Sequence, residues 1–129
     1  MGKEMTVAVM KETIAAFMSA HSLTGVPIVG AGSAMWLHGL RPNTRDIDLY
    51  LPTMDRFHME SVHNGIEVDA HNSWELVEGL SERVVERSKT IEGLQVMGVR
   101  ELLETYQALN RPKDQDSISL LAALMGDIL

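Results

Sequence analysis

Cysteine is absent from this sequence of 129 residues. Its absence excludes disulfide bonds, a catalytic thiolate, and every zinc or iron–sulfur site that needs cysteine ligands. A metal ion held by this chain must therefore be bound by oxygen atoms or by imidazole nitrogen.

Basic residues and long apolar runs are also scarce. The chain carries 11 Lys and Arg against 18 Asp and Glu, a formal net charge of -7. This balance argues against broad, sequence-independent binding of nucleic acid, although it is compatible with a local basic patch. No apolar run approaches the roughly 20 residues that cross a bilayer, and the N-terminus lacks the layout of a signal peptide. We therefore expect a soluble, cytoplasmic protein with no membrane partner.

Hydrophobic residues, by contrast, make up 45% of the sequence. That share is enough to build a core in a chain near the usual size of one domain. No internal repeat, low-complexity tract or linker rich in Pro, Gly or Ser divides the chain. We expect one domain that covers residues 1–129.

The spacing of apolar residues predicts the helices and strands. Steps of three and four residues predict amphipathic helices over 5–20, 99–109 and 118–129, and a short helix is expected over 54–62. The apolar run at 26–29 is expected to form a strand, and a turn and a helix at 34–40 follow it. Two further strands, in which polar and apolar residues alternate, are expected over 45–51 and 66–71. The segments 83–90 and 93–99 are also expected to be extended, with helix as the alternative for 83–90.

Asp46 and Asp48 are the strongest candidates for chemistry. Two residues apart on a strand, they point to one face, with Cα atoms roughly 6.6 Å apart. With a third acid, such a pair can hold two divalent ions, which lie about 3.5–4 Å apart in two-metal sites. Glu67 and Asp69 share one face of the next acidic strand; both can supply that acid, and we favour Asp69 because it lies mid-strand. The ordinary alternative is a solvated acidic face on an edge strand.

Gly32 and Ser33 lie at a predicted turn from strand to helix. Glycine lets the backbone approach a phosphate closely, and the free N–H groups at a helix start attract anions. Ser33 can cap the helix and offer its hydroxyl, although a capped helix start without a phosphate is the commoner use of such a turn. Its combination with the two aspartates favours a phosphate site.

The turn at 32–33, the helix after it, the Asp-x-Asp strand at 46–48 and a later acidic strand together resemble the nucleotidyltransferases of the DNA polymerase β superfamily. The resemblance covers about residues 26–71. In addition, the segment 111–114 and the apolar helix after it are similar to the C-terminal region of small bacterial and phage-borne members, including the AbiEii group. The resemblance implies an α/β (α+β) fold in which a small mixed β-sheet is flanked by helices.

The resemblance also implies an activity: transfer of a nucleoside monophosphate from an NTP to a hydroxyl acceptor, with release of pyrophosphate and with Mg²⁺ or Mn²⁺ as cofactor. It implies that Asp46, Asp48 and Asp69 bind the metal and that Asp69 helps to activate the attacking hydroxyl. It implies further that Gly32 and Ser33 hold the triphosphate. The acceptor can be an RNA end, a protein side chain or a small molecule.

Basic residues for phosphate contacts are less evident. Many small family members place a basic residue soon after the Gly-Ser pair, whereas here the sequence is apolar up to His38. Arg41, Arg45 and Lys113 are the candidates, although Arg45 also fits a surface role in charge balance and Lys113 fits an ordinary loop before a helix. His71 shares the predicted face of Asp69 and could approach the site.

Two other functions fit parts of the pattern. A non-catalytic module with the nucleotidyltransferase fold, acting as a binding or antitoxin-like partner, fits the short chain, which leaves little room for a separate acceptor-binding domain. The presence of acids at all three positions favours turnover instead. A glycosyltransferase that uses Asp-x-Asp to bind a nucleotide sugar is disfavoured, since those domains are usually much larger.

Overall fold

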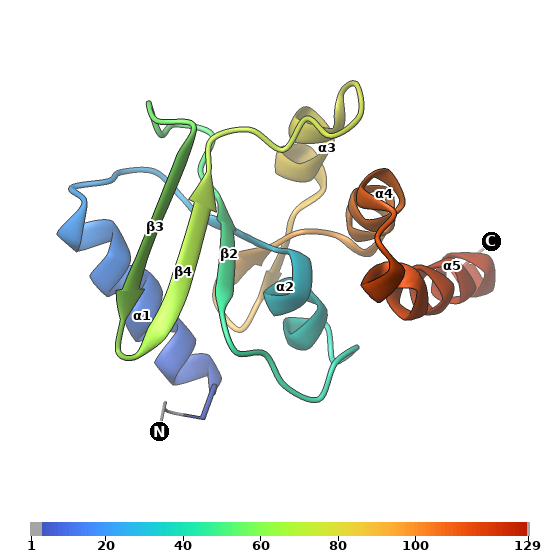
Figure 1. The fold of residues 1–129 in the computed structure, drawn as a ribbon, viewed down its shortest axis with the longest axis horizontal. Coiled ribbons are helices and arrows are strands. Elements are labelled where there is room, and N and C mark those ends of the chain that lie inside the picture. The colour runs from blue at the N-terminus through green and yellow to red at the C-terminus, as the bar shows by residue number, and fades with distance from the viewer. Residues whose placement is uncertain (1–3, 129) are drawn as a thin grey trace.

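The computed structural model describes residues 4–128. Within them the chain forms five α-helices and a six-stranded sheet (Figure 1). The helices are α1 (Val7–Ala20), α2 (Ala31–Leu37), α3 (Leu80–Arg87), α4 (Val99–Leu109) and α5 (Gln115–Ile128). The strands are β1 (Ile28–Gly30), β2 (Ile47–Tyr50), β3 (His58–His63), β4 (Ile66–His71), β5 (Lys89–Ile91) and β6 (Leu94–Val96). A 3-10 turn at Pro112–Asp114 leads into α5.

The sheet is mixed, with the strand order β3-β4-β2-β1-β6-β5. β2 runs parallel to β4 and β1 runs parallel to β6, whereas the β1–β2, β3–β4 and β5–β6 pairs are antiparallel. The expected α/β class, a mixed sheet flanked by helices, is therefore confirmed. Residues 1–3 and 129, which the expected domain also includes, lie outside the described residues.

Helix α1 covers one face of the sheet behind β3 and β4 (Figure 1). Met10, Ile14 and Phe17 of α1 are buried in the same core as Val68 and Ala70 of β4. Because successive strand residues point to opposite faces, the polar residues of β4 lie on the face away from α1. That uncovered face is where the candidate site forms.

The helix expected over 54–62 is wrong, because most of this segment forms β3. Asn64 and Gly65 both adopt positive φ angles of 55° and 73°, as a two-residue hairpin turn requires. The turn brings β3 back along β4, with His58 opposite His71. The ladder supplies the backbone hydrogen bonds that a helix would otherwise have made.

Several other boundaries differ from expectation. Residues 83–87 belong to α3, so the helical alternative was the right one there, and the extended segments expected over 83–90 and 93–99 are confined to β5 and β6. Helix α2 begins at Ala31, with Gly30 as its N-cap, and α5 begins at Gln115. The expected end of this helix, Leu129, lies outside the described residues. None of the described helices is both long and apolar enough to cross a membrane.

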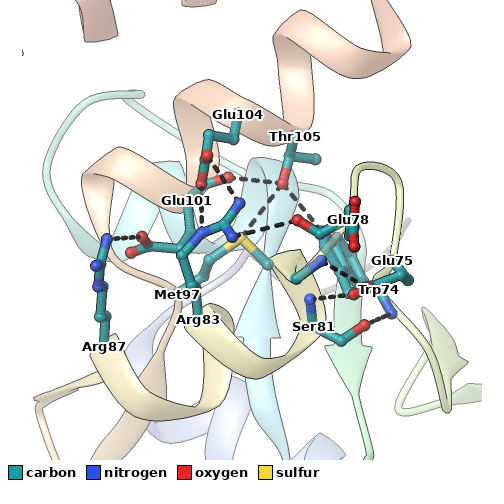
Figure 2. A network of polar contacts seen from close by, with 11 residues as sticks. Trp74, Glu75, Glu78, Ser81, Arg83, Arg87, Met97, Glu101, Glu104 and Thr105 are labelled. Atoms are coloured by element: carbon teal, nitrogen blue, oxygen red, sulfur yellow. Dashed lines mark hydrogen bonds and ion pairs between the residues drawn. The ribbon is translucent and has the colours of Figure 1, made fainter.

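A network of polar contacts joins α3, α4 and the loop between β4 and α3 (Figure 2). Arg83 of α3 donates to Glu104 of α4 at 2.9 Å. In the loop, the indole Nε1 of the buried Trp74 donates to Thr105 Oγ1 at 3.0 Å, and the Trp74 backbone N–H donates to Ser81 Oγ at 2.8 Å. The network fixes Trp74 against α4, where it lines the cavity described below.

Replacing Thr105 with Val tests this network. The substitution keeps the shape of the side chain but leaves the buried indole N–H of Trp74 without an acceptor. We expect the free energy of unfolding to fall by about 1–3 kcal/mol, the cost of a buried unsatisfied donor. Urea denaturation measures the change. Thr90→Val on the exposed strand β5 is the control, and an equal loss in both variants would contradict the assignment.

Candidate functional site

A cavity of about 790 Å³ lies beside the uncovered face of β2 and β4. The start of α2, the second half of α4 and the segment before α5 form its other walls. The acids that line it on the sheet side are Asp46, Asp48 and Asp69, and the cations that line it are Arg41, Arg111 and Lys113. The cavity therefore combines ligands for a divalent cation with partners for a polyanion.

Asp48 and Asp69 lie side by side at the centre of the sheet. They are direct partners in the parallel β2–β4 ladder, so their backbones lie about 4.8 Å apart. Asp46 immediately precedes β2 and is exposed. Glu67 is exposed and does not line the cavity. Of the two acids that the sequence left open, Asp69 is the one beside Asp48.

Asp48 is the electrostatically strained member of this group. The pKa of its carboxyl is raised from 3.8 to about 7, chiefly by burial and in addition by the negative charges of Asp46 and Asp69. Arg111 and Arg41 act in the opposite direction. Because desolvation and like charges both disfavour the ionised form, a bound cation is the natural partner for this carboxylate.

Asp69 has two histidine neighbours on the same face of the sheet. Its Oδ1 accepts a hydrogen bond from His58 Nε2 and lies 3.5 Å from His71 Nε2. Ligand atoms of Asp69, His58 and His71 all lie within 4.8 Å of one another. The carboxylates of Asp46, Asp48 and Asp69 line one cavity but do not form such a close group. The expected approach of His71 to Asp69 is present in the structure.

Ser33 has a structural position that differs from the expected helix cap. Its side chain is fully buried, and Oγ donates to the Gly30 carbonyl at 2.9 Å and accepts from the Asp48 backbone N–H at 3.0 Å. As the third residue of α2, it lies inside the helix and does not line the cavity. Ser33 therefore ties the start of α2 to the strand that carries Asp48.

Gly32 and Ala31 line the cavity at the start of α2. A Cβ atom at Gly32 would lie 2.7 Å from Arg41 Nη1, so glycine leaves the space that this guanidinium occupies. Ala31 has a φ of 50°, a left-handed conformation that is strained for a residue with a Cβ and that clusters at ligand-binding turns. The first turn of α2 thus has a backbone conformation that an ordinary helix start does not need.

Arg41 crosses from the loop after α2 to the C-terminal helices. Its Nη2 donates to Ser117 Oγ at 2.9 Å and to the Tyr106 hydroxyl at 3.5 Å, and its guanidinium lies 5.8 Å from the centre of the Tyr106 ring. These contacts hold a positive charge over Gly32. Burial raises the pKa of the Tyr106 hydroxyl, so Tyr106 stays neutral beside Arg41.

Arg111 is a cavity residue to which the sequence assigned no role. Its Nε and Nη2 donate to the buried Asp114 carboxylate at 2.7 and 3.0 Å, and these hydrogen bonds raise the pKa of Arg111 and lower that of Asp114. Lys113 lines the cavity as expected, whereas Arg45 does not. A basic cluster around Pro112 was visible in the sequence, but the pairing that orients Arg111 depends on the 3-10 turn.

Comparison with protein-family models, with curated proteins and with solved structures gives no match for this chain.

The pKa of Asp48 predicts how stability depends on pH. Because the folded pKa is above the unfolded value, the contribution of Asp48 to stability is full below about pH 3.8 and is lost as the pH rises through about 7. Above pH 8, without divalent ions, we expect Asp48→Asn to raise the free energy of unfolding by at most about 4 kcal/mol. Near pH 4 the gain should vanish.

Denaturation with urea across this pH range, in the presence of EDTA, measures the effect. Asp55→Asn, at an exposed acid outside the cavity, is the matched control and should show no such dependence. A gain for Asp48→Asn that is the same at pH 4 and pH 8 would contradict the assigned electrostatic strain.

Proposed function

We propose that this chain is a nucleotidyltransferase with the fold of the DNA polymerase β superfamily. It transfers a nucleoside monophosphate from an NTP to a hydroxyl acceptor and releases pyrophosphate. The observation that carries the proposal is the cavity that three aspartates, Asp46 just before β2, Asp48 on β2 and Asp69 on β4, line together with three cationic side chains. A metal–triphosphate complex needs both kinds of partner in one place.

The arrangement of the elements supports the fold assignment. Gly32 and Ser33 lie in the first turn of α2, directly after β1, the Asp-x-Asp pair lies at the start of β2, and the third acid lies on β4. The register of β2 and β4 brings Asp48 beside Asp69, and the Ser33 hydroxyl joins α2 to the Asp48 backbone. Motifs that are separate in the sequence thus lie close together, with Gly32 and the three acids facing one cavity.

The aspartates fit Mg²⁺ or Mn²⁺ as the cofactor. Carboxylate oxygens are the ligands that these hard cations prefer, and burial together with the nearby charges of Asp46 and Asp69 raises the pKa of Asp48, a cost of ionisation that a bound cation would offset. Asp46, Asp48 and Asp69 would hold the ions. When bound, they would supply charge neutralisation at the attacking and leaving oxygens.

The cations of the cavity would bind the triphosphate. Arg41 and Arg111 are each oriented by contacts with neighbouring side chains, and an oriented guanidinium can form two parallel hydrogen bonds to phosphate. Lys113 is exposed and adds a mobile positive charge. Gly32 leaves room for the Arg41 guanidinium at the start of α2.

The apolar part of the cavity suits a nucleobase. Phe57, Trp74, Leu76 and Leu109 all line it, and Phe57 is 74% exposed although it is aromatic. Stacking of a nucleobase on an aromatic side chain contributes about 1–3 kcal/mol to binding, whichever base it is. The side chains therefore offer a surface for the base next to partners for the phosphates.

At the α-phosphorus the reaction forms one bond and breaks one. The acceptor oxygen bonds to the α-phosphorus, the bond from that phosphorus to the bridging oxygen of the β-phosphate breaks, and pyrophosphate leaves with the electron pair. Asp69 helps to activate the acceptor by taking the hydroxyl proton. The work of the chain is to place both reactants and to stabilise charge.

Transfer from labelled NTPs tests the proposal. Each NTP is incubated with Mg²⁺ or Mn²⁺ and with RNA, protein and small-molecule acceptors. We expect transfer by the native chain and a loss of at least about 100-fold in the Asp46→Ala, Asp48→Ala double variant, because the ions lose two ligands. Transfer that survives in the double variant would overturn the metal assignment. Absence of NTP binding with either ion, measured by calorimetry, would favour the non-catalytic module instead.

Gly32→Ala tests the phosphate side of the cavity separately. The new Cβ would displace the Arg41 guanidinium, the flexible end of a side chain, so the fold should persist. We expect the Kd for NTP to rise roughly tenfold, which corresponds to the loss of one charge-assisted hydrogen bond. Gly126→Ala is the control, since no atom lies within 4 Å of a Cβ at that position on α5. Equal NTP affinity in the native chain and both variants would exclude this role of Gly32 and Arg41.

A further inference from the structure

The β3–β4 hairpin carries a second set of metal-ligand side chains, distinct from the aspartate pair at β2. Among the described residues, one group of three potential metal ligands lies close together: His58, Asp69 and His71. Each of the three offers one ligand atom, and these atoms lie within 4.8 Å of one another. With Asp69 already a candidate magnesium ligand, the two histidines are the part of this group that the proposed function does not use.

The register of the hairpin builds this group. His58 lies directly opposite His71, and Glu60 lies directly opposite Asp69. Pairs that are two residues apart along a ladder point to the same face, so all four side chains lie on the face away from α1. The position of each ligand is thus set by backbone pairing rather than by a flexible loop.

The spacing of the ligand atoms suits tetrahedral coordination. Bonds of about 2.0–2.1 Å from Zn²⁺ to nitrogen and oxygen place neighbouring ligand atoms roughly 3.3 Å apart. His71 Nε2 lies 3.5 Å from Asp69 Oδ1, close to that value. His58 Nε2 bonds the same oxygen, and its ring stacks on His71 with centroids 4.7 Å apart. A small rotation of His58 away from Asp69 would admit an ion between the three groups.

The surroundings allow an ion to enter and be retained. The side chains of His58, Asp69 and His71 are 31–39% exposed, so the group opens to solvent. Glu60 Oε2 lies 4.0 Å from His58 Nε2 and adds negative charge beside the group. Two imidazoles with one carboxylate, open to water on one side, form a ligand set that zinc uses and magnesium does not.

We propose that His58, Asp69 and His71 form a transition-metal site on the open face of the β3–β4 hairpin, with Zn²⁺ as the fitting ion. The site holds one ion, and water completes its coordination. The proposal does not rest on the transferase activity, because it concerns binding by histidines outside the aspartate pair. Where both sites operate, they share Asp69.

Calorimetric titration of ZnCl₂ into the metal-free chain tests the site. We expect one Zn²⁺ to bind the native chain, and we expect His58→Ala and His71→Ala each to weaken binding by at least about tenfold, since each removes a ligand. Co²⁺ provides a second readout, because its visible absorption reports coordination by the histidines and should be lost in both variants. Circular dichroism of the metal-free variants checks that these substitutions, one exposed and one half-buried, leave the fold intact.

Two further variants make the result decisive. His63→Gln is the control, because His63 and His21 form another histidine pair, on the other side of β3, with ring centroids 6.0 Å apart. Zinc affinity that falls with His63→Gln and not with His58→Ala would overturn the proposal. The Asp46→Asn, Asp48→Asn double variant should keep its zinc affinity. Loss of zinc binding there would place the ion at the aspartate pair and also overturn the proposal, whether or not transfer activity is found.

Discussion

The parallel pairing of β2 with β4 is the constraint on which the candidate site depends. This register places the Asp48 and Asp69 backbones next to each other, and α1 covers the opposite face of β4, so the carboxylates have only one side on which to meet solvent. Burial and like charge then make ionisation of Asp48 costly. Arg41 and Arg111 reduce that cost without removing it, which leaves a carboxylate suited to a cation.

The Ser33 hydroxyl connects the start of α2 to the acidic strand β2. By donating to Gly30 and accepting from the Asp48 N–H, it links β1, α2 and β2 through a fully buried group. A buried hydroxyl with both roles filled positions its neighbours more strictly than an exposed cap would. The serine thus contributes to the site through the placement of Asp48, and Gly32 and Ala31 are the residues of the turn that face the cavity.

The sequence was most informative where the spacing of its hydrophobic residues determines the secondary structure. Alternation predicted the strands around Asp48 and Asp69, because each has one buried face, and three- or four-residue spacing predicted α1 and α4. It failed at β3, whose polar residues show little alternation, although Asn64-Gly65 is a strong hairpin signal that would have placed His58 opposite His71. The meeting of Arg41 with Ser117 across 76 positions depends on tertiary packing and has no local signal.

In the two proposals Asp69 belongs to both ligand sets, and the chemistry of each set decides which cation it would suit. Toward β2 it adds a third carboxylate to Asp46 and Asp48, an all-oxygen set that matches hard ions such as Mg²⁺. Toward β3 it joins two imidazoles, which match Zn²⁺. The hydrogen bond from His58 goes to Oδ1 of Asp69, so an ion held by the histidines would replace that bond, whereas an ion toward β2 could use the other carboxylate oxygen. The two proposed sets are therefore coupled through a single carboxylate.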